Sequence, residues 1–262
     1  MKKNSSLISV IGFWICLTSA LNAYCQSAQD LWNEGMRFEE KFQDAEALRC
    51  FMKILERYPG HSGALCHASK LSAQLGGRLD NLMEKKKKVM FAKDLACRAM
   101  AADQLNADAH FHYIVALGLM AEMADSPVEK LENARIIKRE AEFILRLDSN
   151  YAGVYYILGK WHAAISGLRW VDRLIIKALL GGLPEGASYN ESILSFQRAV
   201  RLRPDYILFY YGLSKALADH GQNEVALKTL EQALLLPSLE PDDEIRKENC
   251  KRLIHLLKSP KS

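Results

Sequence analysis

The stretch Tyr155–Tyr206 constrains the fold of this chain more than any other part of it. Its first half carries Leu158-Gly159 near the start of an apolar helical pattern. Its second half carries Phe196-Gln197-Arg198-Ala199 in another such pattern, which ends before Pro204. In both halves large apolar residues recur at helical spacing, while small residues stand where two paired helices would touch. The stretch therefore predicts a pair of packed helices with an inserted segment between them.

The same arrangement is typical of tetratricopeptide repeats, and it can be followed along the chain. The predicted repeat ends are 45, 45, 55 and 34 residues apart, and they fall at Pro59, Gln104, Ser149, Pro204 and Ser238. Only the last spacing equals the plain repeat of about 34 residues. We therefore predict about five pairs, each an A helix followed by a B helix, with insertions between the A and B helices of the longer repeats.

Helix-capping residues agree with this register. Ser126 and Ser188 each stand before a predicted B helix, with a Glu three residues later, as in a capping box. Pro241-Asp242-Asp243-Glu244 begins a last helix with acidic residues at its positive end, and this helix would cover the apolar flank of the last repeat.

No strand-like alternation of useful length occurs. The predicted fold is all-α: over residues 26–258, a right-handed α-solenoid of about five tetratricopeptide-like helix pairs with an inserted helix and a C-terminal capping helix, followed by a disordered tail, 259–262.

Residues 1–25 have the pattern of a signal peptide. Lys2-Lys3 is a short positive segment, and the apolar core Leu7–Leu17 is too short to span a membrane comfortably. Cleavage after Cys25 fits best, and cleavage after Ala23 is the rival. A lipoprotein that is acylated on Cys25 is disfavoured by the bulky Tyr24 before it, and an uncleaved membrane anchor is the other alternative. The pattern predicts a periplasmic or secreted protein.

The composition bounds the function classes. Of the 262 residues 49% are hydrophobic and 25% are charged, which is neither a disordered composition nor a nucleic-acid-binding one. Without Lys2 and Lys3 the chain has 33 basic and 31 acidic residues, a net charge of +2. We therefore expect no nucleic-acid partner.

The cysteines and histidines do not indicate a reactive or metal centre. The cysteines left after cleavage are Cys50, Cys66, Cys97 and Cys250. We expect them to be buried free thiols, although export would permit disulfides. His162 occupies a core position, where a packed, hydrogen-bonded histidine is more common than a ligand. Gly181-Gly182 is not a phosphate loop, and no His-Glu-x-x-His motif is present. We predict no enzyme activity, no metal and no cofactor.

A binding groove is better indicated. In a helical-repeat stack the A helices line the concave surface. The repeat register places mostly aromatic residues at one A-helix position: Trp32, Cys66, Phe111, Tyr156 and Tyr211. One helical turn later it places mostly lysines: Met36, Lys70, Val115, Lys160 and Lys215. The predicted groove residues are Trp32, Lys70, Phe111, Tyr156, Lys160, Tyr211 and Lys215. The alternative is that the aromatic residues are core and the lysines merely reach solvent.

The inserted segment Leu168–Leu180 has one apolar face, made by Trp170, Leu174, Ile175, Ala178 and Leu179. This face predicts an extra core helix. The alternative is a lid over an apolar cavity, with Trp170, Leu174 and Ile175 as the lid residues.

Four short segments make the chain resemble one family. They are Asn133–Lys138, Leu158–Trp161, the inserted Trp170-x-x-Arg173-x-x-Ile176 helix and Ala233–Pro237, and the resemblance to the regulator of microtubule dynamics family extends over residues 30–257. The resemblance implies a tetratricopeptide-like helical domain that acts by binding. Its eukaryotic members are linked to microtubules, and some to membrane contact sites and lipid binding. An export signal would keep this chain away from microtubules, so we do not expect that partner here.

The sequence thus favours a non-catalytic scaffold or adaptor that binds a protein or peptide partner in its concave groove in the periplasm. The alternative is a lipid-binding domain with an apolar cavity under the Leu168–Leu180 helix.

Overall fold

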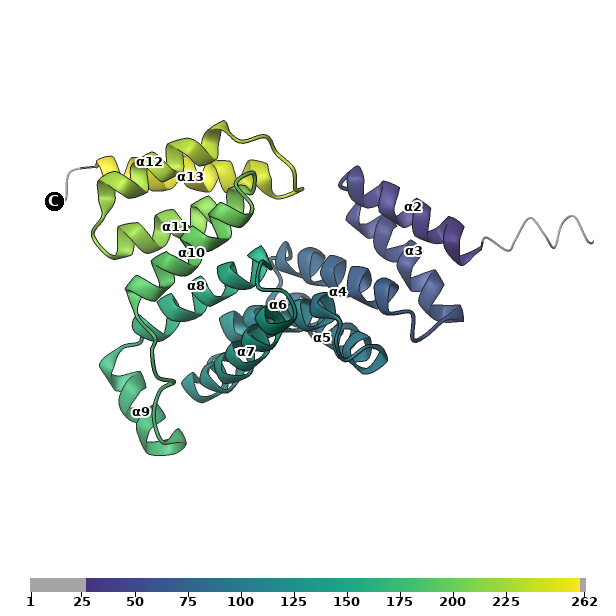
Figure 1. Cartoon of the computed structure of the whole chain (residues 1–262), viewed down its shortest axis with the longest axis horizontal. Helices are drawn as coiled ribbons and strands as arrows, with labels where there is room; N and C mark the ends of the chain where they lie inside the picture. Colours follow the sequence, from purple (N-terminus) through teal and green to yellow (C-terminus); the bar gives the residue numbers. More distant parts are fainter. Residues whose placement is uncertain (1–26, 260–262) are drawn as a thin grey trace, which may run out of the picture. The chain divides into compact units, whose positions relative to one another are not determined.

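The computed structural model describes residues 27–259, and this part of the chain contains twelve helices and no strand (Figure 1). The all-α prediction is confirmed. The predicted signal peptide lies outside the described residues, as does the predicted tail apart from its first residue.

The helices follow one another as pairs, with one extra helix inside the fourth pair and one at the end. The first three pairs are α2 (Ala28–Glu40) with α3 (Asp44–Arg57), α4 (Ser62–Gly77) with α5 (Leu82–Ala102), and α6 (Ala107–Met123) with α7 (Pro127–Leu147). The fourth is α8 (Ala152–Ser166) with α10 (Tyr189–Leu202), separated by α9 (Trp170–Leu180). The fifth is α11 (Ile207–Asp219) with α12 (Asn223–Leu235), followed by α13 (Asp243–Lys258). The predicted inserted and terminal helices are therefore confirmed.

Two compact units make up the chain. The first ends at Pro59 and contains the α2–α3 hairpin. In it Trp32 meets Phe51 edge to face, with ring centroids 5.4 Å apart. Gly35 allows the two helices to approach, because a Cβ atom there would lie 2.9 Å from the Phe51 ring. The second unit begins at Gly60 and contains α4–α13.

The two middle repeats are longer than the plain repeat for a reason that the sequence reading missed. Helices α5 and α7 have 21 residues each, whereas α3 has 14. Only residues 78–81 separate α4 from α5, and only residues 124–126 separate α6 from α7. The prediction of insertions between these A and B helices is wrong, because the extra residues lengthen the helices instead. In the fourth repeat it is confirmed, since α9 stands between α8 and α10.

The fourth pair packs as its small residues indicate. A Cβ atom on Gly159 would lie 2.8 Å from the Phe196 ring, so only glycine permits this approach of α8 to α10. The hydroxyl of Ser192, on α10, donates to the carbonyl of Gly159 at 2.8 Å. Ser188 caps α10 by accepting from the backbone N–H of Glu191 at 3.1 Å, as the sequence predicts.

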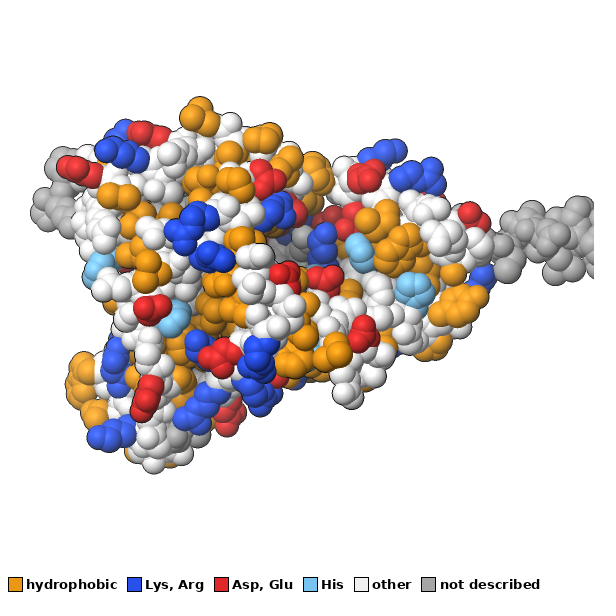
Figure 2. All heavy atoms as spheres, in the orientation of Figure 1, with side chains coloured by type: hydrophobic (Ala, Val, Ile, Leu, Met, Phe, Trp, Pro, Cys, Tyr) orange, Lys and Arg blue, Asp and Glu red, His pale blue; other side chains and the backbone are white. Residues whose placement is uncertain are grey.

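Helix α9 is turned the opposite way from both predictions made for it. Asp172 and Ile176 face the protein and are buried, and α9 packs against α7. Trp170, Leu174 and Ile175 are 72%, 56% and 39% exposed. Figure 2 shows hydrophobic side chains along the outer edge of the region where Figure 1 places α9. These three residues therefore form neither core nor lid.

The cysteine and histidine predictions are partly confirmed. Cys50, Cys66 and Cys250 are buried free thiols, but Cys97 is exposed, so the buried reading is wrong there. His162 is buried as predicted, yet its Nδ1 atom has no hydrogen-bond partner. Burial and the nearby Lys138 lower the pKa of His162, which favours the neutral ring.

Candidate functional site

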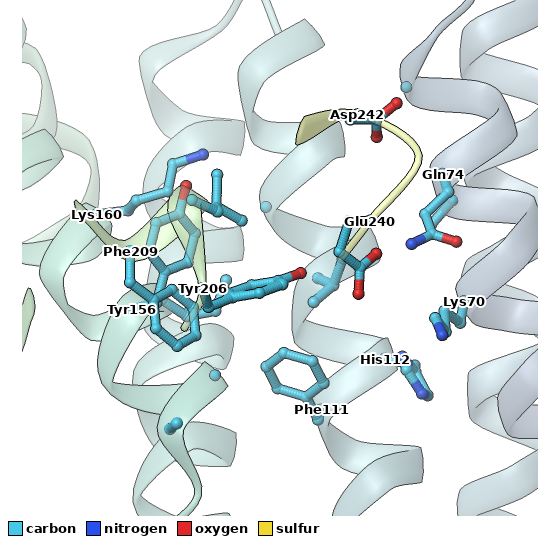
Figure 3. Close-up of a pocket in the computed structure, with 18 of the residues that line it drawn as sticks. Lys70, Gln74, Phe111, His112, Tyr156, Lys160, Tyr206, Phe209, Glu240 and Asp242 are labelled. Carbon is cyan, nitrogen blue, oxygen red and sulfur yellow. The ribbon is translucent and has the colours of Figure 1, made fainter. Parts of the chain in front are cut away.

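A cavity of about 850 Å³ lies in the second unit, lined by the A helices α4, α6, α8 and α11 and by the segment that leads into α13 (Figure 3). Four of the seven predicted groove residues stand in its wall: Lys70, Phe111, Tyr156 and Lys160. They come from three successive A helices, so the repeat register identifies equivalent positions correctly. Whether the cavity binds a partner stays a prediction.

The other three predicted groove residues lie elsewhere. Trp32 belongs to the α2–α3 unit, where it contacts Phe51. Tyr211 packs against a buried cluster that includes Ile207 and Cys250, because α13 covers this face of α11. Lys215 is exposed and does not line the cavity.

An aromatic wall forms one side of the cavity, and Figure 3 shows its rings side by side. Tyr156 stacks on Phe209 with ring centroids 5.4 Å apart, and Tyr206 meets Phe209 edge to face at 4.7 Å. Burial raises the pKa of Tyr206 to about 12, so its hydroxyl stays protonated near neutral pH. This wall offers flat apolar area with a hydroxyl at its edge.

The sequence reading missed Tyr206 and Phe209. Tyr206 precedes α11 just as Tyr151 precedes α8, and both tyrosines line the cavity. A tyrosine directly before two successive A helices was therefore an available signal.

Charged groups of both signs face the same cavity. On the aromatic side the Nζ atom of Lys160 lies 2.5 Å from Oε1 of Glu122. On the opposite side Glu240 projects toward Lys70 and His112 (Figure 3). Burial raises the pKa of Glu240, although Lys70 and Arg246 act in the other direction. The cavity therefore combines an aromatic wall with both acidic and basic groups.

Asp243 fixes the segment that carries Glu240. Its carboxylate accepts from the backbone N–H groups of Leu239 and Glu240 at 2.8 and 2.9 Å. Arg246 donates to the same carboxylate at 2.7 Å. Because the Asp243 side chain is buried, these bonds hold Glu240 in position.

An ion pair joins the end of α4 to the start of α13 at the cavity. Nε of Arg78, at the end of α4, lies 2.6 Å from Oδ1 of Asp242, at the start of α13. These residues are 164 positions apart in the chain. The contact brings the segment before α13 against α4 and closes one side of the cavity.

A second, smaller pocket of about 240 Å³ adjoins the first and is lined mainly by apolar side chains. Glu122, Ile157 and Lys160 line both pockets, so the Glu122–Lys160 ion pair stands between them. The inserted segment contributes Leu168 and Ile176 to this pocket, whereas the predicted lid residues do not reach it.

Gly118 lines both pockets as well, and a Cβ atom there would have no neighbour within 4 Å. It is thus a position on α6 from which a larger side chain would extend into open space.

The two histidines of α6 have different surroundings. His110 is buried, with its Nδ1 atom 2.8 Å from Glu140 and its Nε2 atom 3.0 Å from the carbonyl of Gln104. His112 lines the cavity instead. Within residues 27–259 no three His, Cys, Asp or Glu side chains gather as metal ligands.

Comparison with known proteins gives one family. The model of "Regulator of microtubule dynamics protein 1-3" matches residues 26–258. The human regulator of microtubule dynamics protein 2 is 27% identical over 179 residues, which is 68% of this chain and 43% of that protein. The cattle protein 1 is 30% identical over 142 residues, 54% of this chain and 44% of that protein. The matched region thus spans less than half the length of these relatives.

A solved structure shares the fold. A thermophilic tetratricopeptide-repeat protein from Thermus thermophilus superposes with a TM-score of 0.61 at 16% identity, covering 86% of this chain and all of that one. At this identity the similarity shows the fold alone. No helix within the described part of the chain is long and apolar enough to cross a membrane.

Proposed function

Because the chain belongs to the regulator of microtubule dynamics protein 1-3 family, we propose that it is a non-catalytic, tetratricopeptide-like scaffold that binds a protein or peptide segment in the 850 Å³ cavity of its second unit. One observation carries the proposal: an aromatic wall and charged groups of both signs face one open cavity on successive A helices.

The chemistry of the cavity suits an extended peptide. An apolar or aromatic side chain of the partner would lie on Tyr156 and Phe209, where flat rings provide contact area. The acidic and basic groups on opposite sides provide partners for the donors and acceptors of a peptide backbone. We expect no nucleic-acid ligand, because basic and acidic residues are nearly balanced over the chain, with 35 Lys and Arg against 31 Asp and Glu.

The test uses Gly118→Leu, which places a larger side chain in the open space that both pockets share. Peptides selected from a random library against the purified protein would be measured by calorimetry. We expect affinity to fall about tenfold or more in this variant, because the added leucine occupies volume that the peptide needs. Gly60→Leu is the matched control, since Gly60 is exposed, has nothing near its Cβ position and lies outside the cavity. Equal affinity in both variants would contradict the assignment of the cavity.

A lipid ligand is the rival outcome. Native mass spectrometry of protein purified from its own cell would reveal a retained lipid. A lipid that Gly118→Leu displaces, together with no peptide binding, would overturn the peptide proposal.

We propose further that the protein acts after export, in the periplasm. The support is the Lys2-Lys3 pair followed by the apolar stretch Leu7–Leu17. An exported protein does not meet microtubules, so we do not expect them as partners. Sequencing the N-terminus of the native protein tests this: a start at Gln26 or Tyr24 is expected, and an uncut chain in the cytosol would contradict it.

A further inference from the structure

The outer face of α9 is apolar over half of the helix circumference. Its members are all exposed to solvent: Trp170, Val171, Leu174, Ile175, Ala178 and Leu179. At 100° per residue they form one continuous surface without a charged or polar side chain. We refer to these six residues as the α9 apolar face. Most surface helices show the reverse pattern, with the apolar side turned inward.

The opposite side of α9 explains this orientation. Ile176 is buried against the body of the protein and lines the smaller pocket. Asp172 is also buried, and Nε of Arg169 donates to its carboxylate at 2.9 Å. The inward side of the helix is therefore already occupied, and the α9 apolar face cannot turn toward the core without exposing Ile176.

The exposed charged residues of α9 itself are basic. Arg173 donates to the carbonyls of Leu168 and Ser166 at 3.0 and 2.8 Å, which holds it at the edge of the helix. Lys177 lies one turn later on the same edge and is exposed. Arg135 donates to the carbonyl of Gly182 at 3.0 Å, just beyond the end of α9. The one carboxylate of the helix, Asp172, faces inward.

We propose that the α9 apolar face docks on the surface of an anionic phospholipid bilayer, with α9 lying in the plane of the headgroups. The aliphatic side chains and Trp170 enter the boundary between headgroups and acyl chains, where tryptophan is favoured. Arg173, Lys177 and Arg135 meet the lipid phosphates, so binding depends on anionic lipid. The helix has 11 residues, a length that suits lying on a bilayer and not crossing one.

A second copy of this chain fits the α9 apolar face less well. A helix of 11 residues is about 16 Å long, and one face of it buries only a few hundred Å². A stable interface needs about 800 Å² from each partner, together with hydrogen bonds that this face cannot provide. Two copies would also bring their basic edges together.

The test uses the full chain and two kinds of vesicle: phosphatidylcholine alone, and phosphatidylcholine with phosphatidylglycerol. Wild-type protein should sediment with the anionic vesicles and much less with the neutral ones. The emission of Trp170, taken as the difference between wild type and Trp170→Phe, should shift to shorter wavelength and be quenched by brominated lipid. This difference removes the signal of the other tryptophans, and all variants keep the same N-terminal residues.

Variants at exposed positions complete the test. Leu174→Glu with Ile175→Glu should weaken anionic-vesicle binding about tenfold or more, because two acidic groups replace apolar side chains at the membrane boundary. Leu235→Glu is the matched control, since Leu235 is 86% exposed and lies on α12, and it should change binding less than about twofold. Lys177→Glu should weaken binding to anionic vesicles selectively, whereas Lys228→Glu, at another exposed lysine, should not.

Three results would overturn the proposal. One is an unquenched Trp170 difference signal on anionic vesicles. Another is an equal loss of binding in the α9 double variant and in Leu235→Glu. The third is a concentration-dependent dimer that the double variant abolishes without any effect on vesicles, which would assign the α9 apolar face to a second copy.

Discussion

Helices α8 and α11 have closely matched sequences but different surroundings. Their residues correspond at a constant offset of 55 positions, which aligns Tyr156-Lys160 with Tyr211-Lys215. Even a local hydrogen bond is repeated, because the hydroxyl of Tyr155 donates to the carbonyl of Ser149 at 2.9 Å and that of Tyr210 to Pro204 at 3.0 Å. Yet Tyr156 and Lys160 line the cavity, and Tyr211 and Lys215 do not.

The difference comes from what packs next to each helix. The face of α11 that carries Tyr211 is covered by α13, which places Cys250 and Leu253 in the adjoining cluster. Helix α8 is met by α11, where Tyr156 stacks on Phe209, but this contact still leaves Tyr156 and Lys160 in the cavity wall. Repeat register therefore identifies equivalent positions, but the packing of the neighbouring helix decides whether a position lines the cavity.

The largest expected effect comes from making α11 identical to α8 at one position. Gly212 corresponds to Ile157, and a Cβ atom on Gly212 would lie 2.7 Å from Phe196 and 2.9 Å from Tyr156. Gly212→Ile should therefore lower the free energy of unfolding by about 3 kcal/mol or more, because a tightly packed contact must open. Urea denaturation followed by circular dichroism measures this.

Gly118→Ile is the control for that variant, since it makes the same change on α6 where no atom lies within 4 Å of the Cβ position. Its free energy of unfolding should stay within about 1 kcal/mol of wild type. An equal loss in both variants would show that the helix tolerates isoleucine poorly for reasons unrelated to the contact with Phe196.

This contrast also shows which parts of the fold and of the cavity can be predicted from the sequence. The helix pairs, the inserted helix and the terminal helix follow from apolar periodicity and capping residues such as Ser188, because these are local properties. The position of Tyr156 and Lys160 in the cavity follows from register. The covering of Tyr211 by α13 and the outward turn of Trp170 do not, because each depends on contacts between segments that are distant in the chain. Periodicity identified an apolar face on α9, but it could not show that Ile176 and Asp172 take the inward side.

Replacing Tyr211 and replacing Tyr156 should have different effects on the free energy of unfolding and on peptide affinity. Tyr211→Ala should lower the free energy of unfolding by about 2 kcal/mol, because it leaves a cavity beside the cluster of Ile207 and Cys250. It should leave peptide affinity within about twofold, since Tyr211 does not line the cavity. Tyr156→Ala should reduce both quantities, because Tyr156 lines the cavity and also stacks on Phe209. Denaturation and calorimetry on the same preparations separate the two effects, and a loss of affinity in Tyr211→Ala would contradict the comparison.

The two lysines provide a test of binding alone. Lys160→Glu places a second carboxylate beside Glu122, its ion-pair partner in the cavity wall, and should weaken a peptide selected as above about tenfold. Lys215→Glu makes the same change of charge on an exposed position outside the cavity and should change affinity less than about twofold. Calorimetry at two salt concentrations measures both. Similar losses in the two variants would mean that long-range charge, and not the cavity, governs binding.

The smallest expected effect concerns His162, which corresponds to the buried Leu217 of α11. Its pKa is lowered in the folded state by burial and by Lys138. The unfolded chain therefore binds a proton first as the pH falls below about 6.5, and the free energy of unfolding decreases with pH until the folded histidine is protonated too.

His162→Leu, which copies α11, removes this dependence of the free energy of unfolding on pH and also removes the unpaired Nδ1 atom. We expect the variant to be as stable as wild type at pH 8, or more stable by about 1 kcal/mol at most, with the gap widening toward pH 5. Denaturation at pH 8, 6.5 and 5 measures the gap, and a gap that narrows toward acid pH would show that His162 gains a favourable partner when it is protonated.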